Sequence, residues 1–401
     1  MRIVAVAFAV VFVGATLPSP LYPLYSRVFG FSGFMLTLVY AVYVLGNLAA
    51  LLVFGRLSDQ IGRRAVALPA IIIGIASTLA FLFADATVWL FVARSLSGLA
   101  TGLAAGALTA WIAELEPHGD KTAAAVTASA ANFAGCAAGP AIAGVLAVFA
   151  PQPLRLPYAV YIVGLASIGI MVLRPRETAP QQIARLRDLA LAPRIGIPKR
   201  LRAAFAAPAV TAFATFALLG FYSALIPGLL ADGLRQTSPL VAGGVIAELF
   251  LVSAVAIVLT ARVRSRLAML GGLTLLLPSL ALLIAAELVR SFGILIAATA
   301  LAGAAAALGY RGSLNVVNEI APCEQRAELV SSYLVAVYAG NSLPVIGIGL
   351  IADLATPTTA HLAFAGLIAG LAATALTTAA GPRGKERKST AGSKPAAWAP
   401  R

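Results

Sequence analysis

Three charged residues stand alone inside long uncharged stretches of this sequence. They are Arg94, Glu248 and Arg311, and each is the only Asp, Glu, Lys or Arg of its stretch. A carboxylate in apolar surroundings is disfavoured in its charged form unless it is paired, so Glu248 is a candidate for binding and releasing a proton. An isolated arginine is suited to holding an anion or to neutralising a carboxylate. These residues predict that the protein binds an anion and that it binds and releases a proton.

Both Arg94 and Glu248 lie deep in their stretches. Glu248 lies 13 residues after Arg235 and 14 before Arg262. Arg94 lies 9 residues after Asp85, which is roughly 13 Å along a helix. Two simpler interpretations stay open. In the first, Glu248 is a structural carboxylate that pairs with Arg311 or with a backbone group. In the second, Arg94 is a structural residue whose guanidinium group extends to a polar partner or to the membrane interface.

The composition defines the environment of these charges. Hydrophobic residues make up 60% of the 401 residues and charged residues 11%, whereas a soluble domain has about 25% charged residues. A membrane-spanning helix needs about 20 apolar residues, so the hydrophobic fraction is enough for about twelve. The apolar runs are too long and too uniform for barrel strands. An all-α membrane protein with twelve transmembrane helices is therefore predicted.

Windows with no charge or one charge locate the twelve predicted spans. The nine uncharged windows are Ile3–Ser26, Val28–Gly55, Ala65–Ala84, Thr122–Leu154, Leu156–Leu173, Ala203–Ala231, Leu267–Ala286, Leu329–Ala352 and Leu354–Pro382. The three windows with one charge are Ala86–Ala113, Gln236–Ala261 and Ser291–Asn318.

The residues that most often build catalytic or metal sites are scarce. The two histidines, His118 and His361, are expected in or beside loops, and no pair of carboxylates lies within a span. Cys136 and Cys323 lack the spacing of metal ligands or of a disulfide framework. We therefore predict no catalytic site, no metal and no cofactor.

The basic residues are distributed unevenly between alternate loops. If the N-terminus is inside, the inner segments hold 23 of the 29 Lys and Arg residues and the outer loops hold 4. The positive-inside rule then predicts that both termini are cytoplasmic. Because the surplus of +14 is scattered over many loops, a nucleic-acid partner is not expected. Arg2 and the apolar run after it also resemble a signal peptide, but the length of the run favours a retained span.

The longest polar connection divides the predicted spans into two groups of six. It covers residues 174–202, carries eight basic residues and contains a possible surface helix at Ile183–Leu191. We expect an N-terminal half at residues 1–173, a C-terminal half at residues 203–380 and a disordered tail at residues 381–401. A shift of 205 positions superimposes Glu114 on Glu319 and Gly135 on Gly340. Such repeats predict two pseudo-symmetric halves around a central cavity.

The loop between the second and third spans carries the most specific motif. Gly55 is followed by Asp59, Gly62, Arg63 and Arg64 at the spacing Gly, three residues, Asp, two residues, Gly and two basic residues. This pattern, in this loop of a twelve-span chain, closely resembles the signature of the major facilitator superfamily (MFS). The resemblance implies that the loop acts as a latch, which holds the two halves together on the cytoplasmic side when the cavity opens outward. A plain tight turn is the simpler alternative.

The fifth span carries a second pattern of this kind. Gly135, Gly139, Pro140 and Gly144 resemble the motif of the bacterial twelve-helix drug/proton antiporter-like efflux group, although Ala143 replaces one glycine. The resemblance implies a bendable helix at the interface between the halves. It is the main reason to favour export over uptake.

The same resemblance assigns further roles by position. Arg94 matches an arginine of the family's fourth helix, which implies proton coupling or contact with a substrate anion. Helices one, four, seven and ten line the family's cavity, which makes Tyr22, Tyr222 and Tyr310 possible substrate contacts. Each is also explained as a packing or interfacial aromatic residue.

These observations combine into one functional prediction. We expect a monomeric, multi-pass protein of the cell (inner or plasma) membrane that moves a small molecule by alternating access, with the lipid bilayer and the proton as its other partners. Proton-coupled efflux of drug-like compounds or metabolites is favoured. Proton-symport uptake of a sugar or another small metabolite and a non-transporting receptor are the alternatives.

Overall fold

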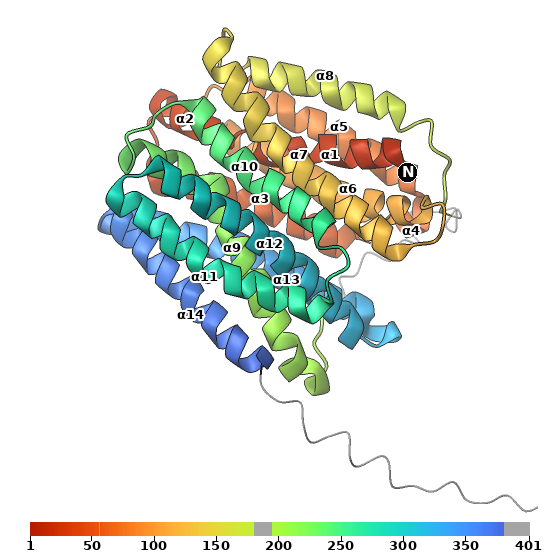
Figure 1. Cartoon of the computed structure of the whole chain (residues 1–401). Coiled ribbons are helices and arrows are strands. Elements are labelled where there is room, and N and C mark those ends of the chain that lie inside the picture. The colour runs from red at the N-terminus through yellow and green to blue at the C-terminus, as the bar shows by residue number, and fades with distance from the viewer. Residues whose placement is uncertain (56, 180–194, 381–401) are drawn as a thin grey trace, which may run out of the picture.

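The structure is a computed structural model that describes residues 1–55, 57–179 and 195–380 (Figure 1). Every regular element of these residues is a helix. Eleven helices of the described chain are long and apolar enough to cross a membrane, and the shorter apolar helix Leu156–Met171 adds a twelfth. The prediction of an all-α, twelve-helix fold is confirmed. The expected surface helix at Ile183–Leu191 and the tail at residues 381–401 lie outside the described residues.

Two groups of helices follow one another along the chain. The first contains α1 (Arg2–Thr16), the 3-10 helix η1 (Ser19–Leu21), α2 (Tyr22–Phe29), α3 (Gly33–Phe54), α4 (Leu57–Ile61), α5 (Arg63–Leu82), α6 (Thr87–Glu114), α7 (Lys121–Phe149) and α8 (Leu156–Met171). The second contains η3 (Lys199–Leu201), α9 (Arg202–Asp232), α10 (Pro239–Leu259), α11 (Ser265–Val289), α12 (Phe292–Ile320), η4 (Cys323–Gln325), α13 (Arg326–Leu354) and α14 (Pro357–Ala380).

The first crossing is a broken helix. Its three pieces, α1, η1 and α2, form one span from Arg2 to Phe29. Pro18 and Pro20 lie at the break, where their missing N–H groups interrupt the helical hydrogen-bond ladder. The carbonyl groups released there are free to accept hydrogen bonds from other helices.

The long helices lie side by side in a bundle, with the first group on one side and the second group on the other (Figure 1). We call the end of the bundle where α1 begins the terminal face and the opposite end the far face. Helix α3 meets α13, and helix α7 meets α10. These two pairs form the main contact between the halves.

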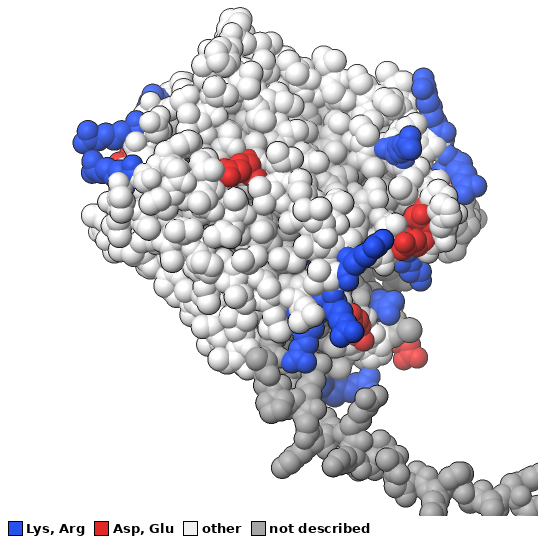
Figure 2. All heavy atoms as spheres, in the orientation of Figure 1, with Lys and Arg blue, Asp and Glu red and all other residues white. Residues whose placement is uncertain are grey.

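The surface is divided as a membrane-spanning protein requires. Large apolar side chains are exposed along the helices, among them Val88 (63%), Leu251 (56%) and Leu354 (78%). Charged side chains gather toward the ends of the bundle and leave a mostly uncharged band between them, in which an acidic group is visible (Figure 2). Lipid tails can cover such a band because it presents few polar groups.

Candidate functional site

Arg94 is fully buried within the first half, on α6. Its Nη1 atom donates a hydrogen bond of 2.8 Å to the carbonyl oxygen of Ala15. Its guanidinium carbon lies 5.8, 5.4 and 4.8 Å from the ring centres of Tyr22, Tyr40 and Tyr43. Three aromatic faces therefore surround the cation, and cation–π attraction offsets part of its desolvation cost.

The break in the first crossing supplies the acceptors for this region. Pro18 has no N–H group with which to bond the Gly14 carbonyl, and Ser97 of α6 donates to that oxygen at 3.3 Å. Arg94 uses the Ala15 carbonyl of the same turn. Helix α6 is thus attached to the irregular part of the first crossing by its polar side chains.

Helix α7 lies against α1 through the glycines of its motif. A Cβ atom on Gly135 would come within 2.1 Å of the Ala9 carbonyl oxygen, and one on Gly139 within 2.5 Å of the Val13 carbonyl oxygen. Only glycine allows the two backbones to approach so closely.

Pro140 lies inside α7 and leaves one carbonyl group without its helical donor. That carbonyl belongs to Cys136, and Thr16 of α1 donates its hydroxyl to it at 2.8 Å. A side chain of the neighbouring helix therefore satisfies the carbonyl group that the proline leaves without a donor. The motif has a structural role at the α1–α7 contact, and its role as a hinge stays a prediction.

Gly144, the last glycine of this motif, contacts the other half. A Cβ atom there would lie 2.8 Å from the Pro239 carbonyl oxygen, and one on Gly243 would lie 2.3 Å from the Pro140 carbonyl oxygen. The pair joins α7 to α10 toward the far face. Thr37 of α3 and Gly349 of α13 form a second close contact between the halves at the same end of the bundle.

Glu248 lies at the middle of α10, beside the lipid-facing side of that helix. Gly244, Leu251 and Val255, which are one helical turn or two away on the same side, are exposed. One carboxylate oxygen is nevertheless buried, and it has no hydrogen-bond partner in the described protein. The carboxylate is within electrostatic range of the Tyr222 hydroxyl. Glu248 therefore stands between the bilayer and the interior of the second half.

Arg311 has a different place from the one expected for a deep intramembrane charge. Its two terminal nitrogens donate to the carbonyl oxygens of Ala261 and Val263 at 3.0 and 3.1 Å. These carbonyls follow the end of α10, so the guanidinium caps that helix and holds its loop. The structure does not place Arg311 in an ion pair with Glu248.

The three candidate cavity tyrosines lie in different surroundings. Tyr22 belongs to the group around Arg94, and Tyr222 is fully buried and accepts a hydrogen bond of 3.3 Å from Thr299. Tyr310 contacts Phe133 of the first half and Phe216 of the second, with ring centres 6.2 and 5.5 Å apart. Of the three, Tyr310 is the one with ring contacts to described residues of both halves.

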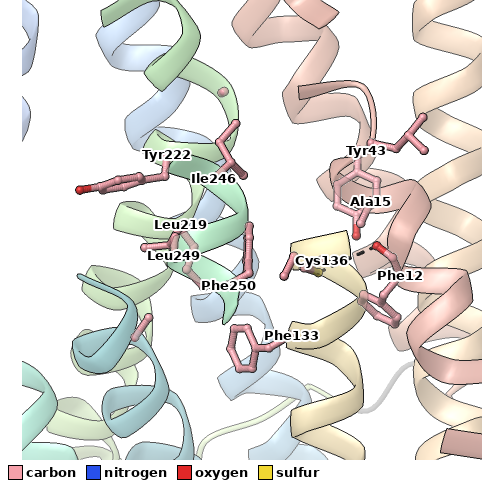
Figure 3. Close-up of a cluster of buried hydrophobic side chains, with 14 of the residues drawn as sticks. Phe12, Ala15, Tyr43, Phe133, Cys136, Leu219, Tyr222, Ile246, Leu249 and Phe250 are labelled. Atoms are coloured by element: carbon pink, nitrogen blue, oxygen red, sulfur yellow. Dashed lines mark hydrogen bonds between the residues drawn. The ribbon is translucent and has the colours of Figure 1, made fainter. Parts of the chain in front are cut away.

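Aromatic side chains concentrate at this meeting point. Phe133 also lies 6.2 Å from Phe250 of α10. In Figure 3, Tyr43, Cys136 and Phe133 on one side face Phe250 and Leu249 on the other. The interface between the halves at this level is apolar and aromatic, which suits an organic ligand.

The signature loop forms a dense polar cluster at the terminal face. Gly62 has φ +112°, a conformation that residues with a side chain rarely adopt. The turn directs the buried side chain of Arg63 toward Ser58, to which it donates at 2.7 Å, and toward Asp59, with which it forms an ion pair. Arg63 also holds both carboxylate oxygens of Glu114, at the end of α6, at 3.1 and 2.5 Å.

Glu177, just after the first six spans, completes this cluster. It accepts the backbone N–H groups of Arg63 and Arg64 at 2.9 and 2.8 Å, so it caps the N-terminus of α5. Although burial alone would raise the pKa of Glu177, these N–H donors hold it below its usual value. Arg64 in turn donates to the Pro175 carbonyl, and Trp111 donates to the Arg176 carbonyl at 3.0 Å. All these partners of the latch residues belong to the first half or to the segment directly after it.

Gly55 lies at the end of α3, where its backbone approaches Gly106 of α6. Glu177 could not be connected with the signature loop from the sequence, because the residue belongs to the basic linker and lies more than a hundred positions away. The requirement for an acceptor at the start of α5 was the only available signal.

A buried hydrogen-bonded pair was not predicted from the sequence. Glu287 of α11 and His361 of α14 are joined by a bond of 2.8 Å, and Thr358 donates to the other oxygen of Glu287 at 2.8 Å. The His361 ring contacts that of Phe221, with centres 5.3 Å apart. His361 was expected in or beside a loop. It does lie in the first turns of α14, but its side chain is buried and connects three helices.

Comparisons with known proteins identify one family that matches this chain. The family model of the Major Facilitator Superfamily matches residues 4–267. A search of curated proteins gives no match.

Solved structures resemble the chain over nearly its whole length. The human organic anion transporter MFSD10 (TETRAN) is 17% identical with a TM-score of 0.69, covering 94% of this chain and 98% of that one. A peptide transporter named POT, in complex with sulfate, is 13% identical with a TM-score of 0.75, covering 94% and 93%. A bacterial homologue of the human lysosomal transporter Spinster, solved inward-facing and unoccupied, is 16% identical with a TM-score of 0.66, covering 94% and 93%. At these identities the likeness shows the fold.

Proposed function

Because the chain belongs to the major facilitator superfamily, we propose that it exports a small organic molecule in exchange for protons. Membership of this family and the fold make it a membrane-embedded secondary transporter of a small molecule, not an enzyme. Coupling to protons and the direction of transport are the parts that we propose, together with a monomeric state and cytoplasmic termini.

The unpartnered carboxylate of Glu248 carries the proposal of proton coupling. An ion at this depth is costly unless it is paired, and no described residue pairs with it. The group therefore gains from binding a proton whenever its surroundings become less polar. Its place at the middle of α10, beside the lipid-facing side of that helix and near Tyr222, lets protonation alter how α10 packs against α9.

The contacts between the halves support alternating access. Thr37–Gly349 and Gly144–Gly243 close the bundle toward the far face. The latch residues at the terminal face meanwhile bond within the first half. If the termini are cytoplasmic, as the basic loops indicate, this arrangement is the inward-facing state, and the latch engages the second half only after the halves rock.

Export is favoured over uptake on the motif of α7. Gly139, Pro140 and Gly144 combine a missing backbone donor with close backbone contacts to both α1 and α10. A helix that touches both halves and is weakened at one point is suited to bend as they move. One solved relative of this fold is named an organic anion transporter, which is compatible with organic cargo for this chain.

The direct test of proton coupling replaces Glu248 by glutamine. Proteoliposomes with an imposed pH gradient and no other driving force are scored for uphill movement of a substrate found by an efflux screen. We expect Glu248→Gln to lose the uphill movement and to keep downhill exchange. Glu324→Gln, which changes an exposed carboxylate next to α13, should behave as the original protein. Normal uphill transport by the Glu248 variant would contradict the assignment.

A further inference from the structure

The connection between α10 and α11 concentrates positive charge at the terminal face. Arg262, Arg264 and Arg266 alternate with Val263 and Ser265, and all three arginines are exposed. The side chains of Arg262 and Arg264 form no ion pair with a residue that the structure describes. We call residues 262–267 the basic loop. Its charges are available to an anion from outside the chain.

The basic loop lies at the edge of the lipid-facing surface. Leu259, at the end of α10, is 78% exposed, and Leu267, in the first turn of α11, is 59% exposed. Val263, within the loop, is exposed as well. Lipid tails cover such apolar side chains, so the arginines between them lie at the level of the lipid headgroups. Figure 2 shows basic side chains gathered at this end of the bundle, where α10 connects to α11 in Figure 1.

Contacts with α12 hold the basic loop in place. The buried Arg311 donates to the carbonyl oxygens of Ala261 and Val263 at 3.0 and 3.1 Å. Ser265 donates to Glu319, near the end of α12, at 2.6 Å. Glu319 is one carboxylate beside three arginines, so the loop keeps an excess of positive charge. A loop that is already ordered loses little conformational entropy when it binds a partner.

The first half shows which interaction is missing at this place. A shift of 205 positions superimposes Asp59 on Arg264. In the first half Asp59 forms an ion pair with Arg63, and this pair fixes the signature loop. In the second half the residue at the same position is a cation, and no described carboxylate forms an ion pair with it. Arg264 is therefore left for an anion that the described chain does not supply.

We propose that the basic loop binds the headgroup of an anionic phospholipid in the membrane leaflet at the terminal face. Arg262 and Arg264 hold the phosphate oxygens, for which the guanidinium group is well suited. The acyl chains lie along Leu259, Val263 and Leu267. Because this site faces the bilayer, it depends neither on the direction of transport nor on proton coupling.

Titration of the delipidated full chain in detergent, measured by native mass spectrometry, tests this site. The probes are phosphatidylglycerol and phosphatidylcholine with the same acyl chains, and inorganic phosphate is the competitor. We expect phosphatidylglycerol to bind about tenfold more tightly, since two arginines attract its net negative charge. Excess inorganic phosphate at constant ionic strength should leave the lipid bound, because phosphate has no acyl chains to contact the apolar side chains.

Paired variants assign the lipid preference to the loop. Arg262→Gln with Arg264→Gln should abolish it, and Arg262→Lys with Arg264→Lys should keep most of it, because the charge is retained. Lys199→Gln with Arg326→Gln is the matched control. It removes two exposed basic residues of the second half from η3 and α13, also at the terminal face, and should bind both lipids as the original protein does. All four positions are exposed, so these variants should fold normally.

Four results would overturn this assignment. The first two are equal binding of the two lipids by the original protein and an unchanged preference in the glutamine variant of the loop. The third is an equal loss of preference in the control variant, which would show that the terminal face attracts anionic lipid as a whole. The fourth is displacement of the lipid by inorganic phosphate, which would indicate a site for a small anion.

Discussion

The carbonyl group of Cys136 shows how one residue on α1 stabilises a helix that contains a proline. Pro140 cannot donate to it, and Thr16 does so at 2.8 Å. Gly139 makes room for this contact, since a Cβ atom there would lie 2.7 Å from the Thr16 hydroxyl oxygen. The carbonyl group that Pro140 leaves free in α7 is therefore satisfied by a side chain of α1.

Replacing Thr16 by valine measures how much this hydrogen bond contributes to the stability of the protein. Valine keeps the shape of threonine and removes the donor, so the Cys136 carbonyl is left buried and unpaired. We expect a loss of about 1 kcal/mol in the free energy of unfolding, measured by denaturant titration in bicelles. Thr16→Ser keeps the hydroxyl and should be nearly neutral. Equal stability of the valine and serine variants would show that the bond contributes nothing.

At the scale of elements, the start of α5 is the most connected point of the terminal face. Arg63 fixes it to α4 and α6, and Glu177 caps its first backbone N–H groups. The segment after the sixth crossing is thus docked onto the latch. Any movement of the latch toward the second half must rearrange these bonds.

The docking of Glu177 should depend on pH in a defined direction. The bound N–H donors hold its pKa below the usual value. The stabilisation is therefore complete above the ordinary pKa of about 4.3 and is lost as the pH falls through the lowered value. Hydrogen-exchange protection of the Arg63 and Arg64 amides should follow this course.

Glu177→Gln should lower the same protection already at neutral pH, because a neutral amide is a weaker acceptor than a carboxylate. Glu116→Gln is the matched control. Glu116 also accepts backbone N–H groups, but in the next loop, from His118 and Asp120 at 2.9 and 2.6 Å. Equal protection in the two variants would refute the docking role.

At the scale of the whole molecule, the helices could be predicted well from the sequence. Long uncharged runs have one stable form in a bilayer, so all twelve predicted windows coincide with helical crossings. The break in the first crossing, at Pro18 and Pro20, was not predicted. The position of a span is determined by the hydrophobicity of its own residues. It can therefore be predicted without knowing which helices the span packs against.

The site was less predictable because its partners are distant in sequence. The depth of Arg94 and Glu248 followed from counting residues, but the three tyrosines around Arg94 belong to α2 and α3 and could be placed only by the fold. Arg311, which lies eight residues from Glu319 within its predicted span, instead caps the loop after α10. The Glu287–His361 pair was missed because each residue, taken alone, lies near a loop.

The central claim is that the substrate leaves in exchange for protons as the halves rock. An exchange of this kind moves protons and substrate in opposite directions in the same cycle. The most direct measurement follows the internal pH of proteoliposomes loaded with substrate, with a trapped pH-sensitive dye, while the substrate flows out down its own gradient. The account predicts that outflow acidifies the interior and that Glu248→Gln abolishes the acidification. Alkalinisation would indicate symport, and outflow without any change in pH would show no coupling; either result would contradict the account.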